Sequence, residues 1–181
     1  EEIIYKLNKD ELDAAILATP LHEINIIEEP LFYEEIKVYA HFNHPLTKKK
    51  LLDHKDIQRD DIWMLSKGNC FRNQVFSICT QPMRTDEQLK YESGSLETLK
   101  KMVEMEGGFT LLPELAVLEL PTKKLNHIAE FKKPKPLREI SIVYARSVSK
   151  KKTIEALKKL IEASVPEYLL DKKRGSVVEW K

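Results

Sequence analysis

The chain has 181 residues, of which 42% are hydrophobic and 33% charged, so it contains enough apolar material for a buried core. Its formal net charge is only +1, which excludes the basic excess of a nucleic-acid-binding surface, and the basic runs at 48–50, 150–152 and 172–174 are expected to be solvated faces or tail. No stretch approaches the roughly 20 apolar residues of a transmembrane helix and no signal peptide opens the chain, so we expect a cytoplasmic protein with no membrane partner.

Strand-like and helix-like segments alternate along the chain, which predicts an α/β architecture with a largely parallel sheet. The chain opens on EEIIYKLNKDELD, which is typical of the end of a helix, and no helix-turn-helix precedes it. In chain order, the predicted strands lie at residues 12–18, 35–41, 61–65, 109–112 and 138–145.

Two amphipathic helices are predicted in the second half of the chain. The first spans 96–106 and ends at Gly107 and Gly108, and Pro113 suits the first position of a further helix. The second lies near the C-terminus, and we expect its apolar face to pack against the core. The apolar face of this second helix consists of Ile154, Leu157, Leu160 and Ile161.

Two proline-containing segments, at 30–33 and 132–139, are predicted crossings between lobes. Two crossings imply two lobes. The first lobe would combine residues 1–32 with 137–181, and the second would be 33–136.

The only two cysteines, Cys70 and Cys79, bracket one short predicted helix. Asn69 is a good N-cap for this helix, after a loop at 66–69. One face of a 3.6-residue repeat consists of Phe71, Val75, Ile78 and Cys79. The other face is predicted to consist of Cys70, Asn73, Gln74 and Ser77.

These two thiols are expected in unlike environments. Cys70 lies in the first helical turn, where unpaired backbone N–H groups, the helix dipole and the nearby Lys67 and Arg72 favour a thiolate. Cys79 has apolar neighbours, and burial keeps a thiol protonated. Nine helical residues rise about 13 to 14 Å, whereas a disulfide requires Cα atoms within about 7 Å, so joining the sulfurs would unwind the helix. Spacing alone also fits two ordinary buried cysteines of an intracellular protein.

The segment GNCFRNQVFSIC, followed by SLETLKKMVEMEGGFTLLP at 95–113, resembles the redox segment and the following helix and strand of the peroxide-sensing LysR-type transcriptional regulators. LDAAILA at 12–18 resembles a strand of LysR-type regulators, and EEPLFYEEIKVYAHFNHPL at 28–46 resembles the strand by which their chain enters the second lobe. The resemblance covers most of the chain and weakens after about Lys150. It implies two Rossmann-like lobes of the LysR-type regulatory, periplasmic-binding-protein-like architecture.

In that family arrangement, lobe I would be N-terminally incomplete here and lobe II would carry the cysteines. The resemblance also leads us to expect that the DNA-binding helix-turn-helix domain is absent from this chain, as are the first regulatory strand and its peroxide-pocket threonines.

By motif position, the resemblance implies that Cys70 reacts with peroxide and that Cys79 resolves it into a reversible intramolecular disulfide. Arg72 matches an arginine of the family and would stabilise the thiolate and orient a peroxide oxygen, the alternative being a surface ion pair. Gly68, Asn69 and Asn73 complete the predicted thiolate environment.

This chain departs from the family at two positions in the redox segment. Asn69 stands where histidine is common, and an asparagine cannot exchange a proton near neutral pH. Asn73 stands where aspartate is frequent, which removes a nearby negative charge.

The resulting hypothesis is a redox-sensing regulatory domain of a transcription factor that controls oxidative-stress genes, and neither an enzyme nor a holder of any cofactor or metal. Its expected partners are hydrogen peroxide, further copies in a homodimer or homotetramer, promoter DNA through the absent domain, RNA polymerase and cellular thiol reductants. One alternative is a LysR-type domain that binds a small organic effector between its lobes, with structural cysteines. The other is a thiol peroxidase, which is a true enzyme.

Overall fold

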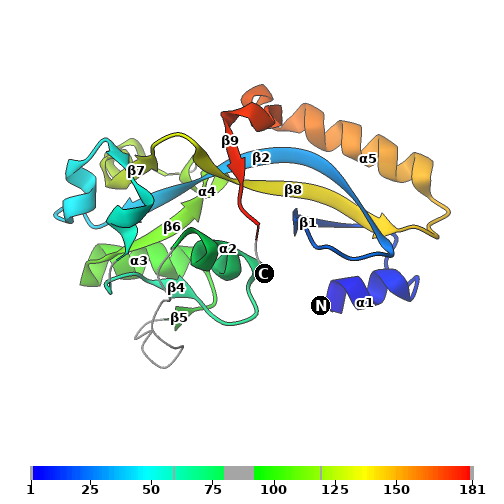
Figure 1. The fold of residues 1–181 in the computed structure, drawn as a ribbon, viewed down its shortest axis with the longest axis horizontal. Helices are drawn as coiled ribbons and strands as arrows, with labels where there is room; N and C mark the ends of the chain where they lie inside the picture. The colour runs from blue at the N-terminus through cyan, green and yellow to red at the C-terminus, as the bar shows by residue number, and fades with distance from the viewer. Residues whose placement is uncertain (1, 59, 80–91, 119, 180–181) are drawn as a thin grey trace. The chain divides into compact units, whose positions relative to one another are not determined.

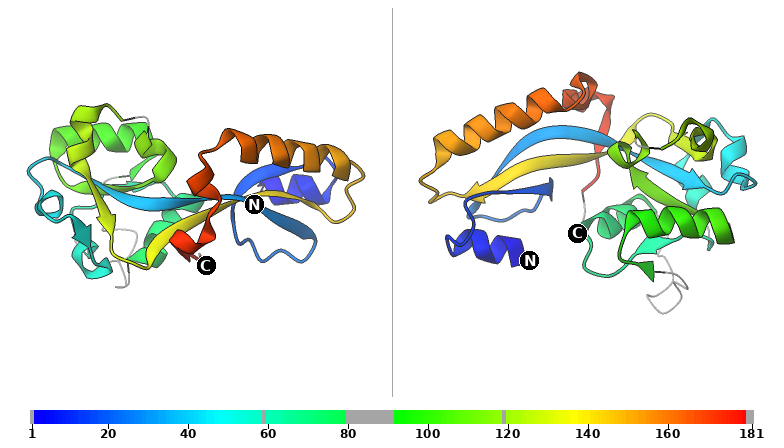
Figure 2. Two further views of the ribbon diagram at one scale, coloured as in Figure 1. Left: turned by 90° about the horizontal axis from the view of Figure 1, so that it is seen from above. Right: turned by 180° about the vertical axis from the view of Figure 1, so that it is seen from behind.

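The computed structural model is a mixed α/β structure in which helices pack on strands (Figures 1 and 2). Every helix in the described ranges is too short or too polar to cross a membrane. The structure describes residues 2–58, 60–79, 92–118 and 120–179.

The chain divides into two compact units. Unit 1 comprises residues 1–34 and 138–173, and unit 2 comprises 35–137 and 174–181. The sequence-based lobes placed 174–181 in the first lobe instead. The difference arises because β9 (Gly175–Val177) pairs in parallel with the start of β8, where Lys135 lies opposite Gly175.

Unit 1 is built on the antiparallel pair of β1 and β8, in which Ala15 lies opposite Val143 and Thr19 opposite Glu139. Its small core includes the buried Leu7, Ile26 and Val143. Helices α1 and α5 lie on opposite sides of these strands (Figures 1 and 2). Its elements are α1 (Glu2–Asn8), β1 (Ala15–Thr19), the first part of β2 (Ile26–Ala40), most of β8 (Lys135–Ala145), α5 (Lys151–Ser164) and 3₁₀ turns at Glu167–Leu170 and Lys172–Arg174.

Unit 2 holds the larger core, in which Tyr39, Phe109 and Phe131 are fully buried. Helix α3 packs against β6 and β4, and α2 packs against β4. Its strands and α-helices, besides the rest of β2 and β8, are β3 (Leu51–Leu52), β4 (Met64–Leu65), α2 (Cys70–Ile78), β5 (Glu92–Ser93), α3 (Leu96–Glu106), β6 (Phe109–Pro113), α4 (Glu114–Leu118), β7 (Ile128–Phe131) and β9. In the described part of unit 2, 3₁₀ turns lie at Pro45–Lys48, His54–Ile57 and Thr122–His127.

The expectation of a largely parallel sheet is wrong. The longest ladders are antiparallel: β1 with β8, and β2 with β6, where Ile36 lies opposite Pro113 and Ala40 opposite Phe109. Strand β7 also runs antiparallel to β2, and the parallel pairs β3–β7, β4–β5 and β8–β9 are short. The apolar pattern of a strand reports which residues are buried but not the direction of the neighbouring strand, which explains the error.

Helix α3 has the predicted limits. Ser95 Oγ accepts from the backbone N–H of Thr98 at 3.2 Å, and the helix ends before Gly107, whose φ is +86°. Gly108 is required for packing, because a Cβ there would collide with the carbonyl oxygen of Asp61. Pro113, predicted to open a helix, instead ends β6 in register with Ile36, and α4 begins one residue later.

The expected burial of the apolar face of α5 is also wrong. Ile154 is buried, but Leu157 is 43% exposed and Leu160 70% exposed. Ile154 is therefore the one buried residue of this face, and Ile161 is partly buried.

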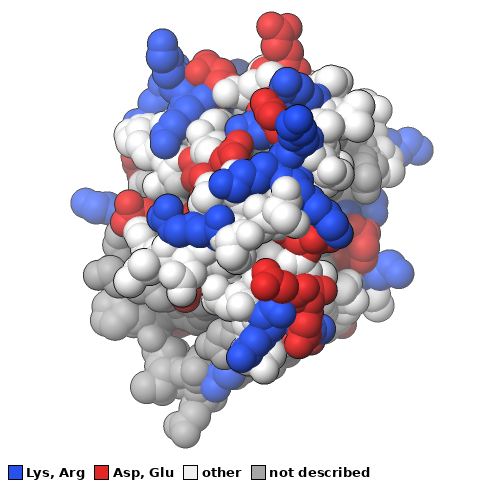
Figure 3. Space-filling model, turned by 90° about the vertical axis from the view of Figure 1, so that its right-hand side faces the viewer, with Lys and Arg blue, Asp and Glu red and all other residues white. Residues whose placement is uncertain are grey.

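Basic and acidic side chains are interspersed on the face shown in Figure 3. In unit 1, Lys150 pairs with Asp13 at 2.8 Å and Lys158 with Glu29 at 2.8 Å. The runs at 48–50 and 150–152 are exposed, as the sequence predicts. The third run is not simply a solvated tail, because the side chain of Arg174 is only 16% exposed.

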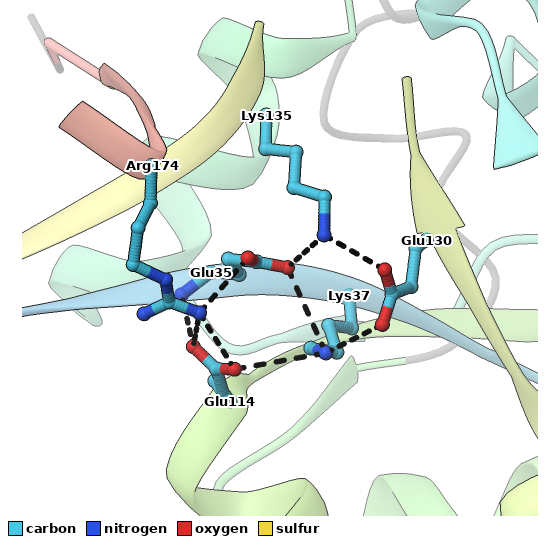
Figure 4. Close-up of polar contacts among 6 residues, drawn as sticks. All are labelled: Glu35, Lys37, Glu114, Glu130, Lys135 and Arg174. Atoms are coloured by element: carbon cyan, nitrogen blue, oxygen red, sulfur yellow. Dashed lines mark hydrogen bonds and ion pairs between the residues drawn. The ribbon is translucent and has the colours of Figure 1, made fainter. Parts of the chain in front are cut away.

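Arg174 belongs to a closed ring of alternating charges in unit 2, which we call the ion ring (Figure 4). In order, the ring consists of Glu35, Arg174, Glu114, Lys37, Glu130 and Lys135. Arg174 lies 2.9 Å from both carboxylate oxygens of Glu114 and 2.9 Å from Glu35. Lys135 bridges Glu35 at 2.9 Å and Glu130 at 2.8 Å. The ring thus joins β2, α4, β7, β8 and the segment that precedes β9.

Candidate functional site

Helix α2 is positioned by β4 and by the loop at 66–69. The backbone N–H of Ser66 donates to Ser93 at 2.9 Å, which extends the β4–β5 contact to the start of the loop. Gly68 then adopts φ +86°, a conformation that glycine tolerates, and turns the chain into the helix. Asn69 is the N-cap, as predicted, since its side-chain oxygen accepts from the N–H of Phe71 at 3.0 Å.

The two cysteines occupy opposite ends of α2. Cys70 is the first helical residue and is partly exposed, whereas Cys79 is the C-cap and only 7% exposed. The two cysteines are not joined in a disulfide in this structure. Burial raises the pKa of the Cys79 thiol to about 11, so this thiol is protonated at neutral pH. The cysteine at the start of the helix is therefore partly exposed, whereas the cysteine at its end is buried in the core.

The intact helix holds these sulfurs apart. The nine residues from Cys70 to Ile78 form one continuous α-helix, and the N–H of Cys79 donates to Val75 at 3.1 Å. At 1.5 Å per residue, the Cα atoms of Cys70 and Cys79 are separated by about 13 Å, whereas a disulfide requires about 7 Å or less. A bond between them requires α2 to unwind and Cys79 to leave the core.

Arg72 does not lie on the surface, where the alternative placed it, because it is only 3% exposed. Its Nη1 donates to the carbonyl oxygen of Leu65 at 2.5 Å, and its guanidinium lies over the ring of Phe76 at 5.0 Å from the centroid. Arg72 thus ties α2 to the end of β4 and places a buried positive charge in the first turn of the helix.

Gln74 is the main departure from the predicted helix faces. Predicted on the outer face, it is fully buried, with 0% exposure, and neither its side-chain oxygen nor its nitrogen has a hydrogen-bond partner. A helical wheel would have found this, since residues four apart differ by only about 40° and Gln74 therefore lies beside Ile78. Gln74 was assigned to the outer face because its side chain is polar, not because of its angular position on the helix.

The remaining predicted site residues are peripheral to the buried part of α2. Asn73 is exposed, and its carbonyl accepts from Ser77 Oγ at 3.2 Å. The side-chain oxygen of Asn69 is engaged in the cap. Formation of a disulfide is expected to refold residues 68–80, and Thr80, the last of them, lies outside the described residues.

The core beneath α2 is closely packed. A cavity between β4 and the helix, bordered by Leu65, Phe71 and Arg72, has a volume of about 10 Å³. Such a space holds about one water-sized molecule, which is too small for an organic effector.

Comparison with known proteins assigns the chain to a family of regulators. The "Hydrogen peroxide-inducible genes activator" of Dickeya chrysanthemi is 34% identical over 143 residues, which cover 79% of this chain and 47% of that protein. The "DNA-binding transcriptional dual regulator OxyR" of Escherichia coli K12 is 32% identical over 164 residues, which cover 90% of this chain and 53% of that protein. The chain thus spans about half the length of the curated relatives it matches.

Solved structures agree with these relatives. The crystal structure of OxyR from Porphyromonas gingivalis matches with a TM-score of 0.85 at 26% identity, over 97% of this chain and 80% of that one. The reduced OxyR regulatory domain from Pseudomonas aeruginosa matches with a TM-score of 0.75 at 32% identity, over 90% and 79%. The predicted fold class and the resemblance to peroxide-sensing regulators are confirmed. Because residues 1–165 match the family described as LysR substrate binding domain, the chain belongs to that family.

Proposed function

We propose that this chain is the redox-sensing regulatory part of a LysR-type transcription factor that detects hydrogen peroxide through Cys70 and Cys79. The observation that carries the proposal is the contrast between the two ends of α2, one with a partly exposed thiol and the other with a buried thiol. The similarity to hydrogen peroxide-inducible genes activators supports it. The two compact units would be regulatory lobes I and II, with the cysteines in lobe II.

The proposed chemistry is balanced within the thiol pair. The Cys70 thiol gives up its proton, the thiolate attacks one oxygen of hydrogen peroxide, and the O–O bond breaks. The leaving hydroxide takes up that proton, so the products are a Cys70 sulfenic acid and water. The Cys79 thiol then attacks that sulfur, which forms the disulfide and releases a second water molecule. Two thiols are oxidised and one peroxide is reduced. Cellular thiols would reverse the step by exchange, so the pair signals stoichiometrically and is not an enzyme.

Residues around the first turn support the proposed role of Cys70. The dipole of α2 places partial positive charge at the helix N-terminus, and the buried guanidinium of Arg72 adds positive charge in the same turn. Gly68 and Asn69 set the start of the helix, and Asn73 completes its outer face. The amide of Gln74, one turn beyond Cys70, is a further polar group on this helix.

Formation of the disulfide would refold 68–80 and alter how copies of the regulatory domain associate. In the whole protein, a homodimer or homotetramer in the cytoplasm, this change would act on promoter DNA and on RNA polymerase and so control oxidative-stress genes. The names of the relatives support peroxide and DNA as partners of those proteins.

The proposal is tested by treating the reduced chain with one equivalent of hydrogen peroxide and mapping cysteine pairing by mass spectrometry. A rapid Cys70–Cys79 disulfide is expected in the wild type, and a persistent Cys70 sulfenic acid in Cys79→Ser. Cys70→Ser should form neither product. Survival of both thiols in the presence of excess peroxide would contradict the proposal.

The alternatives give different results in the same assay. A thiol peroxidase would sustain rapid consumption of peroxide when a thiol reductant is supplied, whereas a sensor would consume peroxide only as fast as its disulfide is slowly reduced again. A domain that binds an organic effector would keep both thiols in peroxide and would respond to its ligand unchanged after Cys70→Ser.

A further inference from the structure

The buried side-chain amide of Gln74 makes no hydrogen bond to the protein core around it. In the part of the chain that the structure describes, three buried side-chain nitrogen or oxygen atoms lack a hydrogen-bond partner, and two of them are on Gln74. The side chain is 0% exposed. An amide offers two donors and two acceptor lone pairs, so the whole hydrogen-bonding capacity of this side chain is unused.

An unpaired buried amide opposes the conformation that buries it, because the amide loses its hydrogen bonds to water without replacing them. Native proteins contain few such groups, and those that occur call for an explanation. Gln74 lies midway between the two cysteines, on the helix that must unwind before the sulfurs can meet. Unwinding α2 would return the amide to solvent.

The remaining buried residues of α2 act in the opposite direction. Phe71, Val75 and Ile78 are at most 5% exposed, and their burial stabilises the helical, dithiol form. Cys79 is also buried there. If α2 were stabilised only by such residues, the dithiol form would be strongly favoured over the disulfide. A feature that destabilises the helical form is therefore needed if the thiol pair is to respond to peroxide.

We propose that Gln74 is this offset: its unpaired amide destabilises the dithiol form of α2 and thereby shifts the Cys70–Cys79 equilibrium toward the disulfide. The inference rests on the proposed function for its redox consequence, whereas the destabilisation itself does not depend on it. Gln74 acts through the helix and has no chemical role in the reaction with peroxide.

The test replaces Gln74 with methionine, which has nearly the same shape and no amide, and compares it with Ser77→Met on the exposed face of the same helix. Gln74→Leu is a second replacement should methionine pack poorly. Three quantities are measured on the 181-residue chain: the denaturant midpoint of the reduced protein, the thiol–disulfide equilibrium in glutathione buffers, and the rate of sulfenic acid formation in a Cys79→Ser background.

Gln74→Met is expected to raise the denaturant midpoint and to shift the redox equilibrium toward the dithiol form about five- to a hundredfold, the range that corresponds to one unsatisfied buried polar group. The rate of sulfenic acid formation should stay within about twofold of the parent, because the amide does not take part in the reaction with peroxide. Ser77→Met should leave all three quantities nearly unchanged.

An unchanged or lowered midpoint in both Gln74 variants would overturn the inference. A slower formation of sulfenic acid without a gain in stability would also overturn it, because Gln74 would then contact the oxidant. If the wild type forms no disulfide, the proposed function fails and the redox part of the inference fails with it. In that case the denaturant midpoint still decides whether the amide destabilises α2.

Discussion

Two buried polar regions of unit 2, the ion ring and helix α2, are built in opposite ways. In the ion ring, three carboxylates and three cations alternate, and each has an opposite charge within 4 Å on both sides. In α2, Arg72 contacts the carbonyl of Leu65 and Gln74 has no partner. Buried polar groups that are fully paired hold one arrangement, whereas unpaired ones favour a change. The comparison indicates that, in the proposed formation of the disulfide, the ion ring would stay fixed and α2 would rearrange.

The ion ring also lies at the points where the chain passes between units. Glu35 is the first residue of unit 2, Arg174 is the first residue of its C-terminal segment, and Lys135 lies just before 137, where the chain leaves it. The ring therefore holds together the chain near all three points at which it enters or leaves unit 2. Rearrangement of α2 can then remain local.

The largest expected effect tests the fixed region. Arg174→Ala should lower the free energy of unfolding by about 3 kcal/mol, because Glu35 and Glu114 would stay buried and each would lose one of its cations, with only lysines left to pair with them. The control is Lys150→Ala, which breaks an exposed pair with Asp13 and should cost less than about 1 kcal/mol. Urea denaturation measures both. Equal losses in the two variants would remove the distinction between a buried ring and a surface pair.

The next effect concerns the buried thiol of α2. The pKa of Cys79 is raised by burial to about 11 from 9.0, so this thiol stabilises the fold fully below pH 9 and the contribution is lost as the pH rises to 11. Between pH 9 and pH 11 the free energy of unfolding of the wild type should fall by about 2 to 3 kcal/mol more than that of Cys79→Ala. Denaturation at pH 8, about pH 9.5 and about pH 11 gives this difference. Parallel curves for the two proteins would show that Cys79 does not titrate from a buried site.

A smaller effect is expected from the acid side of the ion ring. Hydrogen bonds from Lys135 and Lys37 lower the pKa of Glu130 to about 2 from 4.5, so its contribution is present above pH 4.5 and is lost as the pH falls to 2. Since Glu130 is 38% exposed, solvent screening should limit the contribution to about 1 to 2 kcal/mol. Glu130→Gln should flatten the acid branch of the stability curve. If the stability of Glu130→Gln falls as steeply at low pH as that of the wild type, other carboxylates cause the acid sensitivity.

The smallest effect sharpens the account of α2. Asn69→Ala should destabilise the reduced chain by about 1 kcal/mol, because the N–H of Phe71 loses its cap. Asn69→Asp, which keeps an acceptor in place, should lose much less. The difference between the two variants is read from thermal unfolding of the dithiol form. A loss of the same size in both would mean that the capping bond contributes little.

Local features of this chain were predictable from sequence because they depend on neighbouring residues. The limits of α3 follow from Ser95 as N-cap and Gly107 as terminator, and the start of α2 follows from Asn69. The α/β class followed from the alternation of strand-like and helix-like segments, and the LysR-type lobe architecture followed from the family resemblance. Strand direction did not follow, because an apolar run is buried whether its neighbours are parallel or antiparallel.

Long-range polar contacts were not predictable. Nothing in the run at 172–174 signals that Arg174 meets Glu114, a residue 60 positions earlier. The exposure of Leu160 contradicts its place in an apolar pattern, which reports amphipathicity but not what covers it. At the candidate site, both cysteines, Asn69 and Arg72 could be identified from the motif, whereas Gln74 could be found only from its helical angle. Polar residues are mostly exposed, so an unpaired one in the core contradicts the ordinary expectation.

The most direct test of the account is hydrogen exchange of the reduced chain and of the chain after one equivalent of hydrogen peroxide, read by mass spectrometry with the disulfide mapped in the same digest. We predict a Cys70–Cys79 bond together with lost protection in α2. The segment beside the ion ring, where the N–H of Val178 donates to Leu137 at 2.8 Å, should keep its protection. A disulfide that forms with α2 still protected, or equal loss of protection in both regions, would contradict the central claim.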